Sequence, residues 1–341
     1  MATGNLDRVV IVMMSAIGDA VHVLPIVNAL KRHSPTSRVT WILEPKPATL
    51  VRGHPAIDEI IEIPRSRGLG DWRRIRRSLR DREFDVALDF QVAFKAGLVT
   101  SMVNAPRKIG FDRRRARDLN WLFTNEKIAA HANQHVADQY FEFLDHLGVP
   151  HQQPQWNLGP WPHEADRARG LLPSSARPFA AIAIATTRAD RDWPADRWAR
   201  VIDALHDRHG VHAVLVGGRS PRELDAERVI RERSRHQPIS TLGCTLRELV
   251  AVLHAAALVL TPDTAPMHIA VALGRPVISL FGSTDPRRTG PYRASQDLIV
   301  NAFRENDDSD DILIDKRPGR MQRIQVDDVL AKVELWNRSY R

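Results

Sequence analysis

The chain has 341 residues, of which 43% are hydrophobic, and a formal net charge of +8. Because single hydrophobic cores seldom grow beyond ~250 residues, this length predicts two domains of about 150 residues each. The positive charge favours a negatively charged partner, such as a nucleic acid, an anionic membrane surface or a phosphorylated substrate.

The single cysteine, Cys244, excludes an intrachain disulfide and a multi-cysteine zinc site, and it fits a reducing compartment. The first apolar run, residues 9–14, is too short for a secretory core or a membrane span and follows the polar residues NLDR. We therefore expect a soluble, cytoplasmic protein.

Short β-rich runs alternate with helical patterns through the first half of the chain. The β-rich runs are RVVIVMM at 8–14, RVTWILE at 38–44 and FDVALDF at 84–90, and a helical pattern occupies 19–33. This alternation predicts a parallel sheet with helices on both faces. A second series follows, with β-rich runs at 179–187 and 212–218 and helical patterns at 198–210, 223–233 and 245–254.

The proline-rich stretch 150–178 separates the two series and is the best candidate for a linker. We predict an α/β protein with two Rossmann-like domains, the first at 1–155 and the second at 178–325, joined by a linker at 156–177. The acidic segment NDDSDD predicts a loop, and an amphipathic pattern predicts a closing helix within 326–341.

The stretch 261–292 combines an acidic turn, a small-residue helix, a strand and a Gly/Pro loop. The run AAALVL predicts a strand that ends at Leu260, where the residues TPD interrupt the extended pattern. The residues TAP predict the cap and first turn of a helix, whose free backbone donors attract anions. A second strand at 277–281 stops at small residues that let a ligand approach the backbone. Two strand ends therefore face one crevice.

A polar turn, SAIGDAVH, follows the first predicted strand and contains Asp19. It places Asp19 at the carboxyl edge of the sheet, where open α/β folds bind ligands, near a helix N-terminus that favours an ionised carboxylate. Asp19 is therefore either a general base or a helix cap, the commoner role of Asp at such a position. The turn has one glycine, Gly18, where a dinucleotide fingerprint needs three, which argues against a dehydrogenase.

The β-rich run at 179–187 leads into a second polar turn, TTRADRDWP. Thr186, Thr187, Arg188 and Arg191 suit a diphosphate, since hydroxyls and guanidinium forks neutralise the charge that grows as this group leaves. The alternative is a solvated loop with Trp-Pro opening the next helix. His268 lies on an apolar helical face and is either a site residue or a hydrogen-bonded core residue.

Basic residues are concentrated in the predicted N-terminal domain. Arg65, Arg67, Arg73, Arg74 and Lys108 belong to this set. They are either solvated helix faces or a surface for an anionic acceptor or acidic lipid. Nucleic acid is disfavoured as a partner, because only 6% of residues are aromatic and no nucleic-acid-binding motif is evident.

Three segments together resemble the heptosyltransferases of glycosyltransferase family 9: SAIGDAVHVLP, TTRADRDWP and TPDTAPMHIAVALGRPVISLFGSTDPRRTGPY. The similarity extends more weakly over nearly the whole chain, and TTRADRDWP resembles heptosyltransferase I. The resemblance implies the GT-B fold, two Rossmann-like domains whose parallel sheets face each other across an active-site cleft. It implies an inverting enzyme that moves heptose from ADP-L-glycero-D-manno-heptose to the Kdo-lipid A inner core in lipopolysaccharide biosynthesis. Such an enzyme would work as a peripheral protein at the cytoplasmic face of the inner membrane.

The resemblance also implies roles for individual residues. Asp19 would be the general base that deprotonates the acceptor hydroxyl, and Asp263 would accept hydrogen bonds from the sugar. The nucleotide-sugar donor would contact Thr186, Thr187, Arg188, Arg191, Asp263, Thr264, Ala265, Pro266, Met267 and His268. The anionic lipopolysaccharide precursor would contact Arg65, Arg67, Arg73, Arg74 and Lys108. No metal or other cofactor would be needed, because arginines and a helix N-terminus supply the positive potential.

The sequence departs from the family pattern at two positions. Arg191 stands where heptosyltransferase I carries lysine, and Met13 stands where family members often carry a basic residue. Three alternatives remain open at this point. They are a family 9 transferase with another donor sugar or a protein acceptor, a nucleotide-sugar epimerase of GT-B fold, and a non-enzymatic protein that binds nucleic acid or membrane.

Overall fold

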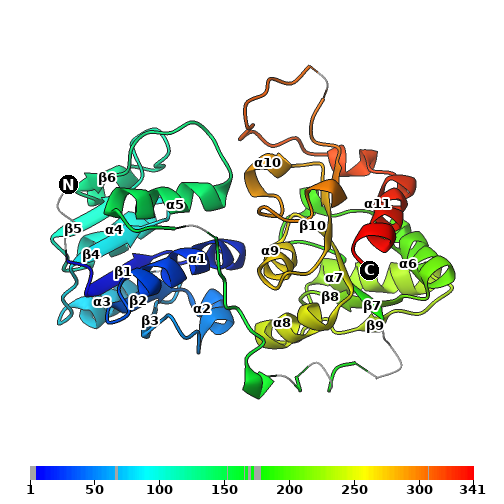
Figure 1. Cartoon of the computed structure of the whole chain (residues 1–341), viewed down its shortest axis with the longest axis horizontal. Helices are drawn as coiled ribbons and strands as arrows, with labels where there is room; N and C mark the ends of the chain where they lie inside the picture. Colours follow the sequence, from blue (N-terminus) through cyan, green and yellow to red (C-terminus); the bar gives the residue numbers. More distant parts are fainter. Residues whose placement is uncertain are drawn as a thin grey trace. The chain divides into compact units, whose positions relative to one another are not determined.

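The computed structural model describes residues 5–65, 68–151, 153–164, 166–167, 170–172, 178–305 and 307–341. The chain forms two compact units (Figure 1). Unit 1 comprises Met1–Ala132 and Val136–Asn157, and unit 2 comprises Asn133–His135 and Leu158–Arg341. The chain thus passes finally into unit 2 within the range predicted as a linker.

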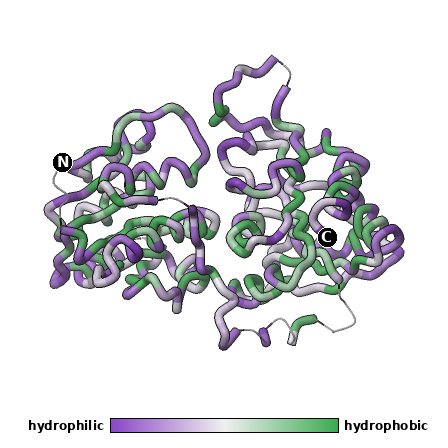
Figure 2. The backbone as a smooth tube through the Cα atoms, in the orientation of Figure 1, coloured by the Kyte–Doolittle hydropathy of each residue, from purple (hydrophilic) through white to green (hydrophobic). Residues whose placement is uncertain are grey.

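Unit 1 contains a six-stranded parallel sheet, as the alternating pattern predicts. Its strands are β1 (Arg8–Val12), β2 (Arg38–Leu43), β3 (Glu59–Glu62), β4 (Val86–Asp89), β5 (Arg107–Gly110) and β6 (Glu126–Lys127). Their order in space is β3-β2-β1-β4-β5-β6. The central strands β1 and β4 are apolar and buried at nearly every position, because helices cover both faces of the sheet (Figure 2).

The helices of unit 1 lie in two layers. They are α1 (Ile17–His33), α2 (Pro45–Val51), α3 (Leu69–Leu79), α4 (Phe94–Met102), α5 (Val136–Leu147) and the 3₁₀ turn η1 (Asn120–Phe123). Apolar residues of α3 and α4, including Ile75 and Val99, form one core with Val10 and Val12 of β1. On the opposite face α1 packs against α2 and α5 (Figure 1).

Unit 2 repeats this topology. Its strands are β7 (Phe179–Ala183), β8 (His212–Val216), β9 (Ile239–Ser240), β10 (Leu258–Pro262), β11 (Val277–Phe281) and β12 (Ile299–Asn301). The order is β12-β11-β10-β7-β8-β9, and all pairs are parallel. Numbered within each unit, both sheets therefore have the order 3-2-1-4-5-6. Two Rossmann-like units are confirmed.

The helices of unit 2 also cover both faces of its sheet. They are α6 (Ala195–His209), α7 (Pro221–Arg233), α8 (Leu246–Ala255), α9 (Ala265–Ala272), α10 (Pro286–Thr289) and α11 (Val326–Ser339), with 3₁₀ turns η2 (Pro162–Glu164), η4 (Ala189–Arg191), η5 (Gln296–Leu298) and η6 (Arg320–Arg323). On one face Trp198 of α6, Ile230 of α7 and Trp336 of α11 share a core with the strands. On the other, α8 packs against α9. The predicted closing helix is α11.

The predicted end of the strand before Asp263 is wrong by two residues. β10 continues to Pro262, which is in register with Leu280 of β11, whereas pairing with β7 stops at Leu260. Pro262 is tolerated as the last residue because a proline φ suits extended backbone and the strand ends there. At the other end of the run AAALVL, Ala255 is the last residue of α8 instead of a strand residue.

A buried ion pair fastens the segment after Asn157 to unit 2. Arg247 of α8 donates to Glu164 (Nε to Oε1, 2.8 Å) and to the carbonyl of Leu158 (3.1 Å). The same guanidinium stacks on Trp161, 3.7 Å from the ring centroid. These contacts satisfy two charges that are almost completely removed from water, so this part of the predicted linker has a defined structure.

Candidate functional site

Each sheet has one topological switch point, where connections from two neighbouring strands leave toward opposite faces. In unit 1 it lies between β1 and β4, and in unit 2 between β7 and β10. Open α/β sheets bind ligands in the crevice at the carboxyl edge of such a pair. The segments predicted to carry chemistry, the turn with Asp19, the turn 186–194 and the turn with Asp263, all begin at these strand ends.

Asp19 is the third residue of α1 and is half-buried. Its Oδ2 accepts a hydrogen bond from the backbone N–H of Ala16 (3.0 Å), the residue that caps the helix. The hydroxyl of Tyr140 donates to Oδ1 (3.4 Å). Asp19 therefore forms the acidic half of a capping box while its second oxygen faces the tyrosine. The two roles predicted for it, helix cap and reactive carboxylate, do not exclude each other.

Gln91 braces the turn that carries Asp19. Its side-chain carbonyl accepts from the N–H of Met14 (3.0 Å), and its amide donates to the carbonyl of Ser15 (2.9 Å). Gln91 follows the carboxyl end of β4, so this contact joins the two strands that form the switch point of unit 1. Sequence reasoning missed it, because a glutamine after a strand carries no signal of its own.

Asp89, the last residue of β4, is completely buried beside Gln91. Its carboxyl accepts from Thr100 Oγ1 (2.8 Å), from Asn120 Nδ2 (3.0 Å) and from the N–H of Gln91 (3.1 Å). It thus joins β4 to α4 and η1. Asp89 is the penultimate residue of the run FDVALDF, and an acidic residue in this place was the available sequence signal for its role.

In unit 2 the turns after β7 and β10 are joined by an ion pair. Arg191 Nη1 lies 2.9 Å from Asp263 Oδ2 and donates to the carbonyl of Asp263 (3.1 Å). Thr284 and Thr289, from the segment after β11, donate to the same Oδ2 (2.7 and 3.3 Å). Among the described residues no hydrogen bond is made to Oδ1. The structure therefore brings together Arg191 and Asp263, two of the residues predicted to contact the donor.

The start of α9 lies next to this pair. Thr264 precedes the helix in an extended conformation, Pro266 has no N–H, and the N–H of Met267 donates to the carbonyl of Thr264 (3.0 Å). The N–H groups of Thr264 and Ala265, both half-buried, are then the donors that this helix start presents to an anion. The positive end of the α9 dipole adds to the positive potential of the Arg191 guanidinium.

His268 lies one turn into α9 and is buried. Burial lowers the pKa of its imidazole to about 4, although the nearby Asp263 acts in the opposite direction. The ring is therefore neutral near pH 7 and offers hydrogen bonds without charge. His268 therefore packs within α9 and also lies near the other residues predicted to contact the nucleotide sugar.

In the turn after β7, the two threonine hydroxyls have different surroundings, and so do the two arginine guanidinium groups. Thr186 is buried, and its hydroxyl exchanges hydrogen bonds with the backbone of Arg188 (2.6 and 3.0 Å), whereas Thr187 is exposed. Arg188 pairs with Asp190 through two hydrogen bonds of 3.0 Å. That pairing, with a further bond from Ser283, lowers the pKa of Asp190 to about 2. Arg188 is thus compensated locally, while Arg191 reaches the neighbouring turn.

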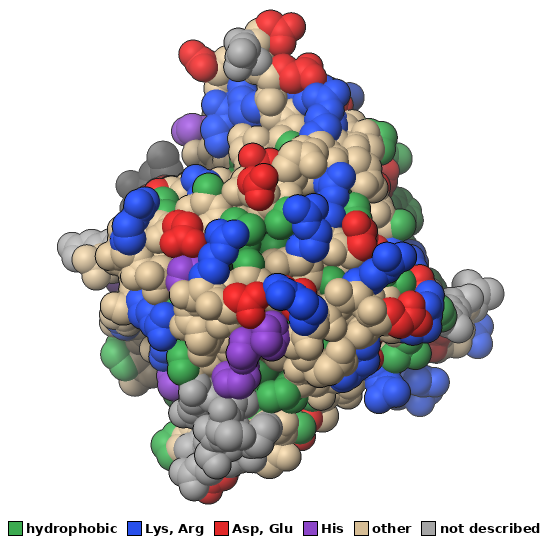
Figure 3. Space-filling view, turned by 90° about the vertical axis from the view of Figure 1, so that its right-hand side faces the viewer, with side chains coloured by type: hydrophobic (Ala, Val, Ile, Leu, Met, Phe, Trp, Pro, Cys, Tyr) green, Lys and Arg blue, Asp and Glu red, His purple; other side chains and the backbone are tan. Residues whose placement is uncertain are grey.

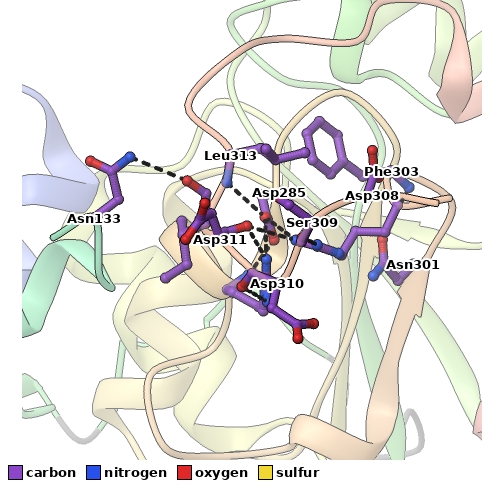
Figure 4. A network of polar contacts seen from close by, with 12 residues as sticks. Asn133, Asp285, Asn301, Phe303, Asp308, Ser309, Asp310, Asp311 and Leu313 are labelled. Carbon is purple, nitrogen blue, oxygen red and sulfur yellow. Dashed lines mark hydrogen bonds and ion pairs between the residues drawn. The ribbon is translucent and has the colours of Figure 1, made fainter. Parts of the chain in front are cut away.

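A third buried carboxylate orders the segment after β11. Asp285 caps α10 by accepting from the N–H of Arg287 (3.0 Å). It also accepts from Arg304 Nη1 (2.8 Å) and from the N–H of Leu313 (3.1 Å). Figure 4 shows Asp285 close to Asp310, Asp311 and Leu313. The described residues 307–311 of the acidic segment form a loop, as predicted, and this loop is tied to the turn that carries Thr284.

The predicted acceptor residues do not form one group. Arg65 follows β3, and Arg73 and Arg74 lie on α3; all three are exposed. Lys108 lies near the beginning of β5, toward the sheet edge opposite to Asp19, and donates to the carbonyl of Ser101 (3.2 Å). Arg67 lies outside the described residues. The acceptor assignment stays a prediction.

Within the described ranges, one group of side chains has the spacing of metal ligands: His206, Asp207 and His236. It belongs to α6 and the loop before β9, and it includes no predicted site residue. Figure 3 views the molecule from the side of α6 and α11, where histidines gather among acidic and basic side chains.

Every described helix is too short or too polar to cross a lipid bilayer.

Comparison with known proteins gives consistent matches. Residues 72–312 match the sequence profile of glycosyltransferase family 9 (heptosyltransferase). The chain is 31% identical over 300 residues to the lipopolysaccharide core heptosyltransferase OpsX of Haemophilus influenzae, which covers 87% of this chain and 84% of that protein. It is 30% identical to lipopolysaccharide heptosyltransferase 1 of Escherichia coli K12, over 88% of this chain and 95% of that protein.

The solved structure of E. coli heptosyltransferase WaaC with ADP is similar to this chain, with a TM-score of 0.75 and 26% identity. The similarity covers 96% of this chain and 99% of that one. Together with the matching strand order of the two units, it confirms the expected GT-B fold.

The buried Asp89 predicts a pH dependence of stability. Burial raises the pKa of its carboxyl to about 7, against the effect of its hydrogen bonds. The folded state then holds a proton that the unfolded state releases near pH 4, so this group's contribution to stability is lost as pH rises from about 4 to about 7. Between pH 5 and pH 8 the wild type should lose about 2–3 kcal/mol of unfolding free energy relative to Asp89→Asn.

Urea unfolding at the two pH values measures this difference. Asp81→Asn, which removes an exposed carboxylate of the same unit, is the control and should follow the wild type. Parallel pH profiles for the wild type and Asp89→Asn would show that the buried carboxyl is ionised throughout.

Proposed function

Because the chain belongs to glycosyltransferase family 9, we propose that it moves heptose from ADP-L-glycero-D-manno-heptose to the Kdo-lipid A inner core. Relatives with about 30% identity over most of the chain are lipopolysaccharide heptosyltransferases. The similar solved structure that binds ADP supports an adenine nucleotide as the leaving group. The product would be an intermediate of lipopolysaccharide biosynthesis.

The observation that carries this proposal is the meeting of Arg191, Asp263 and the start of α9 at the switch point of unit 2. A nucleotide sugar presents two phosphates and several hydroxyls within a short length. The guanidinium and the N–H groups of Thr264 and Ala265 suit the diphosphate, whose negative charge increases as the glycosidic bond breaks. Oδ1 of Asp263 suits a sugar hydroxyl, because a carboxylate is an acceptor only.

The remaining donor residues have supporting roles in the proposal. Thr187 is exposed and offers a hydroxyl, and Thr186 holds the backbone of the turn through its bonds to Arg188. Pro266 and Met267 fix the helix start, and the neutral His268 lies behind it. Since Arg191 and the start of α9 supply the positive potential, the proposed reaction needs no metal.

Asp19 is the proposed general base. Its Oδ1 would take the proton from the acceptor hydroxyl as that oxygen attacks the anomeric carbon on the side opposite to ADP, which inverts the configuration there. The bond from the N–H of Ala16 holds the carboxylate, and Gln91 holds the turn. The exposed arginines at 65, 73 and 74 are proposed to attract the carboxylates and phosphates of the acceptor. We propose that the enzyme works at the cytoplasmic face of the inner membrane.

A nucleotide panel and a transfer assay test the function. ADP should stabilise the protein against heat, UDP, GDP and CMP should not, and ADP-heptose with Kdo-lipid A should yield ADP and a heptosylated lipid. Stabilisation by UDP alone would exclude ADP-heptose as the donor. Conversion of the nucleotide sugar without any acceptor would instead indicate an epimerase.

Asp19→Asn should lower kcat by about 10²- to 10⁴-fold and leave the Kd for ADP unchanged, since it removes the base and keeps the shape. Asp328→Asn is a matched control, because Asp328 is also a third helix residue whose Oδ2 accepts from the capping residue, Gln325 (2.7 Å). That variant should retain full turnover. Near-normal turnover of Asp19→Asn would remove Asp19 from the chemistry.

Asp263→Asn should weaken binding of an unreactive ADP-heptose analogue by about 10- to 100-fold, the effect of losing a hydrogen bond to a charged group. Binding of ADP alone should change by less than about 3-fold, because the proposed partner of Oδ1 is the sugar. Calorimetric titration with both ligands measures the two constants. Equal losses would mean that Asp263 acts on the nucleotide or only through Arg191.

A further inference from the structure

Exposed apolar side chains gather at one place on unit 1. Among the described residues, Phe94, Leu119 and Leu122 are 41%, 49% and 64% exposed, and they are the only large hydrophobic residues of unit 1 with such exposure. The corresponding residues of unit 2, Leu224, Ile314 and Tyr340, come from separate segments. A local group of exposed apolar residues marks an interaction surface more often than single ones do.

The three residues belong to two elements that pack tightly. The ring of Phe94, at the start of α4, meets that of Phe123 in η1 edge-on, with centroids 5.4 Å apart. Gly97 allows this approach, since a Cβ there would lie 2.2 Å from the Phe123 ring. Leu119 precedes η1 and Leu122 lies within it, so the three exposed side chains come from two elements that pack against each other.

The backbone of this turn is held in an unfavourable conformation. Asp118 and Leu119 both have positive φ, 51° and 63°, in the left-handed region that leucine rarely adopts. This strained backbone conformation leaves the side chain of Leu119 exposed to solvent. Strain that exposes an apolar side chain has no benefit for folding and points to a function for the exposed residue.

Exposed arginines precede Leu119 in the same loop. Arg113, Arg114 and Arg117 are exposed, and among the described residues none of their guanidinium groups pairs with a carboxylate. Arg113 lies over the ring of Trp121 (5.3 Å to the centroid). Arg228 of unit 2, by contrast, pairs with two acidic residues. The only acidic side chain within residues 113–122 is Asp118.

We propose that Phe94, Leu119 and Leu122, with Arg113, Arg114 and Arg117, form a surface that docks on an anionic phospholipid bilayer. Apolar side chains enter the boundary of the acyl chains while the arginines contact lipid phosphates. The inference rests on the proposed function in one respect, because that function requires an acceptor embedded in a membrane.

The position of the surface agrees with this role. The segment leading to Phe94 leaves the carboxyl end of β4, and the segment with the arginines leaves the carboxyl end of β5. The turn with Asp19 leaves the carboxyl end of β1, so base and surface share one edge of the sheet. Asp89 holds α4 and η1, and Gln91 holds the turn of Asp19, so one buried network connects the two. Docking would bring this edge to the lipid.

Vesicle sedimentation of the full chain tests the surface. Vesicles of phosphatidylethanolamine with phosphatidylglycerol should bind the wild type, and neutral phosphatidylcholine vesicles should bind it much less. The double variant Leu119→Asp/Leu122→Asp should lower the partition coefficient at least tenfold, since aspartate tolerates the left-handed conformation and two leucines lose burial. Leu224→Asp, the same substitution at an exposed leucine of α7 (39% exposed), should bind as the wild type does.

The arginines are tested separately. Replacing Arg113, Arg114 and Arg117 by Gln should lower binding to anionic vesicles by about 100-fold and weaken its salt dependence. The matched variant with Gln at Arg228, Arg231 and Arg235 removes the same charge from unit 2 and should have little effect. Wild-type binding by either surface variant, or equal losses in the matched controls, would overturn the proposal. Loss of a dimer in solution, instead of vesicle binding, would assign the surface to self-association and overturn it as well.

Transfer assays separate this inference from the proposed function. The surface variants should retain turnover on a deacylated, soluble acceptor and lose it on the acceptor in vesicles. If the wild type heptosylates neither acceptor, the proposed function fails, while sedimentation still decides whether the surface binds lipid.

Discussion

The parallel pairing of β7 with β10 is the constraint on which the candidate donor site depends. Neighbouring parallel strands end at the same edge, so turns that are 72 residues apart in the chain meet there and place Arg191 against Asp263. Their connections leave toward opposite faces, which keeps helices away from the edge and gives a ligand access. The pairing of β1 with β4 has the same consequence in unit 1, where Gln91 reaches the turn of Asp19 across 77 residues.

Buried carboxylates give these edges their fixed geometry. Asp89, Asp263 and Asp285 each lie at or just after the end of a strand, and each accepts hydrogen bonds from segments distant in sequence. Because a buried carboxylate must have its acceptor sites satisfied, each one holds several turns in place at once. Their partners differ, since Asp263 and Asp285 contact arginines while Asp89 receives hydrogen bonds only from neutral groups. That difference explains why the pKa of Asp89 is raised so far by burial.

The structure also separates two kinds of basic residue that the sequence presents alike. Arginines of unit 2 are largely engaged by carboxylates of the same helix or of neighbouring turns, as Arg228 and Arg231 are. Arg113 and Arg114 of unit 1 are exposed and have no such partners in the described part of the chain. Local charge compensation, more than composition, therefore decides which basic residues are available for an anionic surface or ligand.

The sequence by itself determined the class of the fold, the strand-helix alternation and the segments that carry the candidate site. These follow from local physics: continuous apolar runs form strands buried on both faces, and small or proline-rich turns end them. The predicted strand at 277–281 agrees with β11, and the helix predicted to begin after Thr264 agrees with α9. The end of β10 was misjudged, because pairing with β11 continues through Pro262 and pairing is not a local property.

Only the tertiary structure decided which side chains meet. The bond from Gln91 to the turn of Asp19 and the bonds from Thr284 and Thr289 to Asp263 depend on strand order, which residue spacing does not encode. The same holds for Lys108, whose sequence neighbours suggest an acceptor site and whose place in β5 lies toward the opposite edge. A sequence specifies its turns locally, but contacts between turns arise from the packing of whole strands, and that packing is a property of the complete sheet.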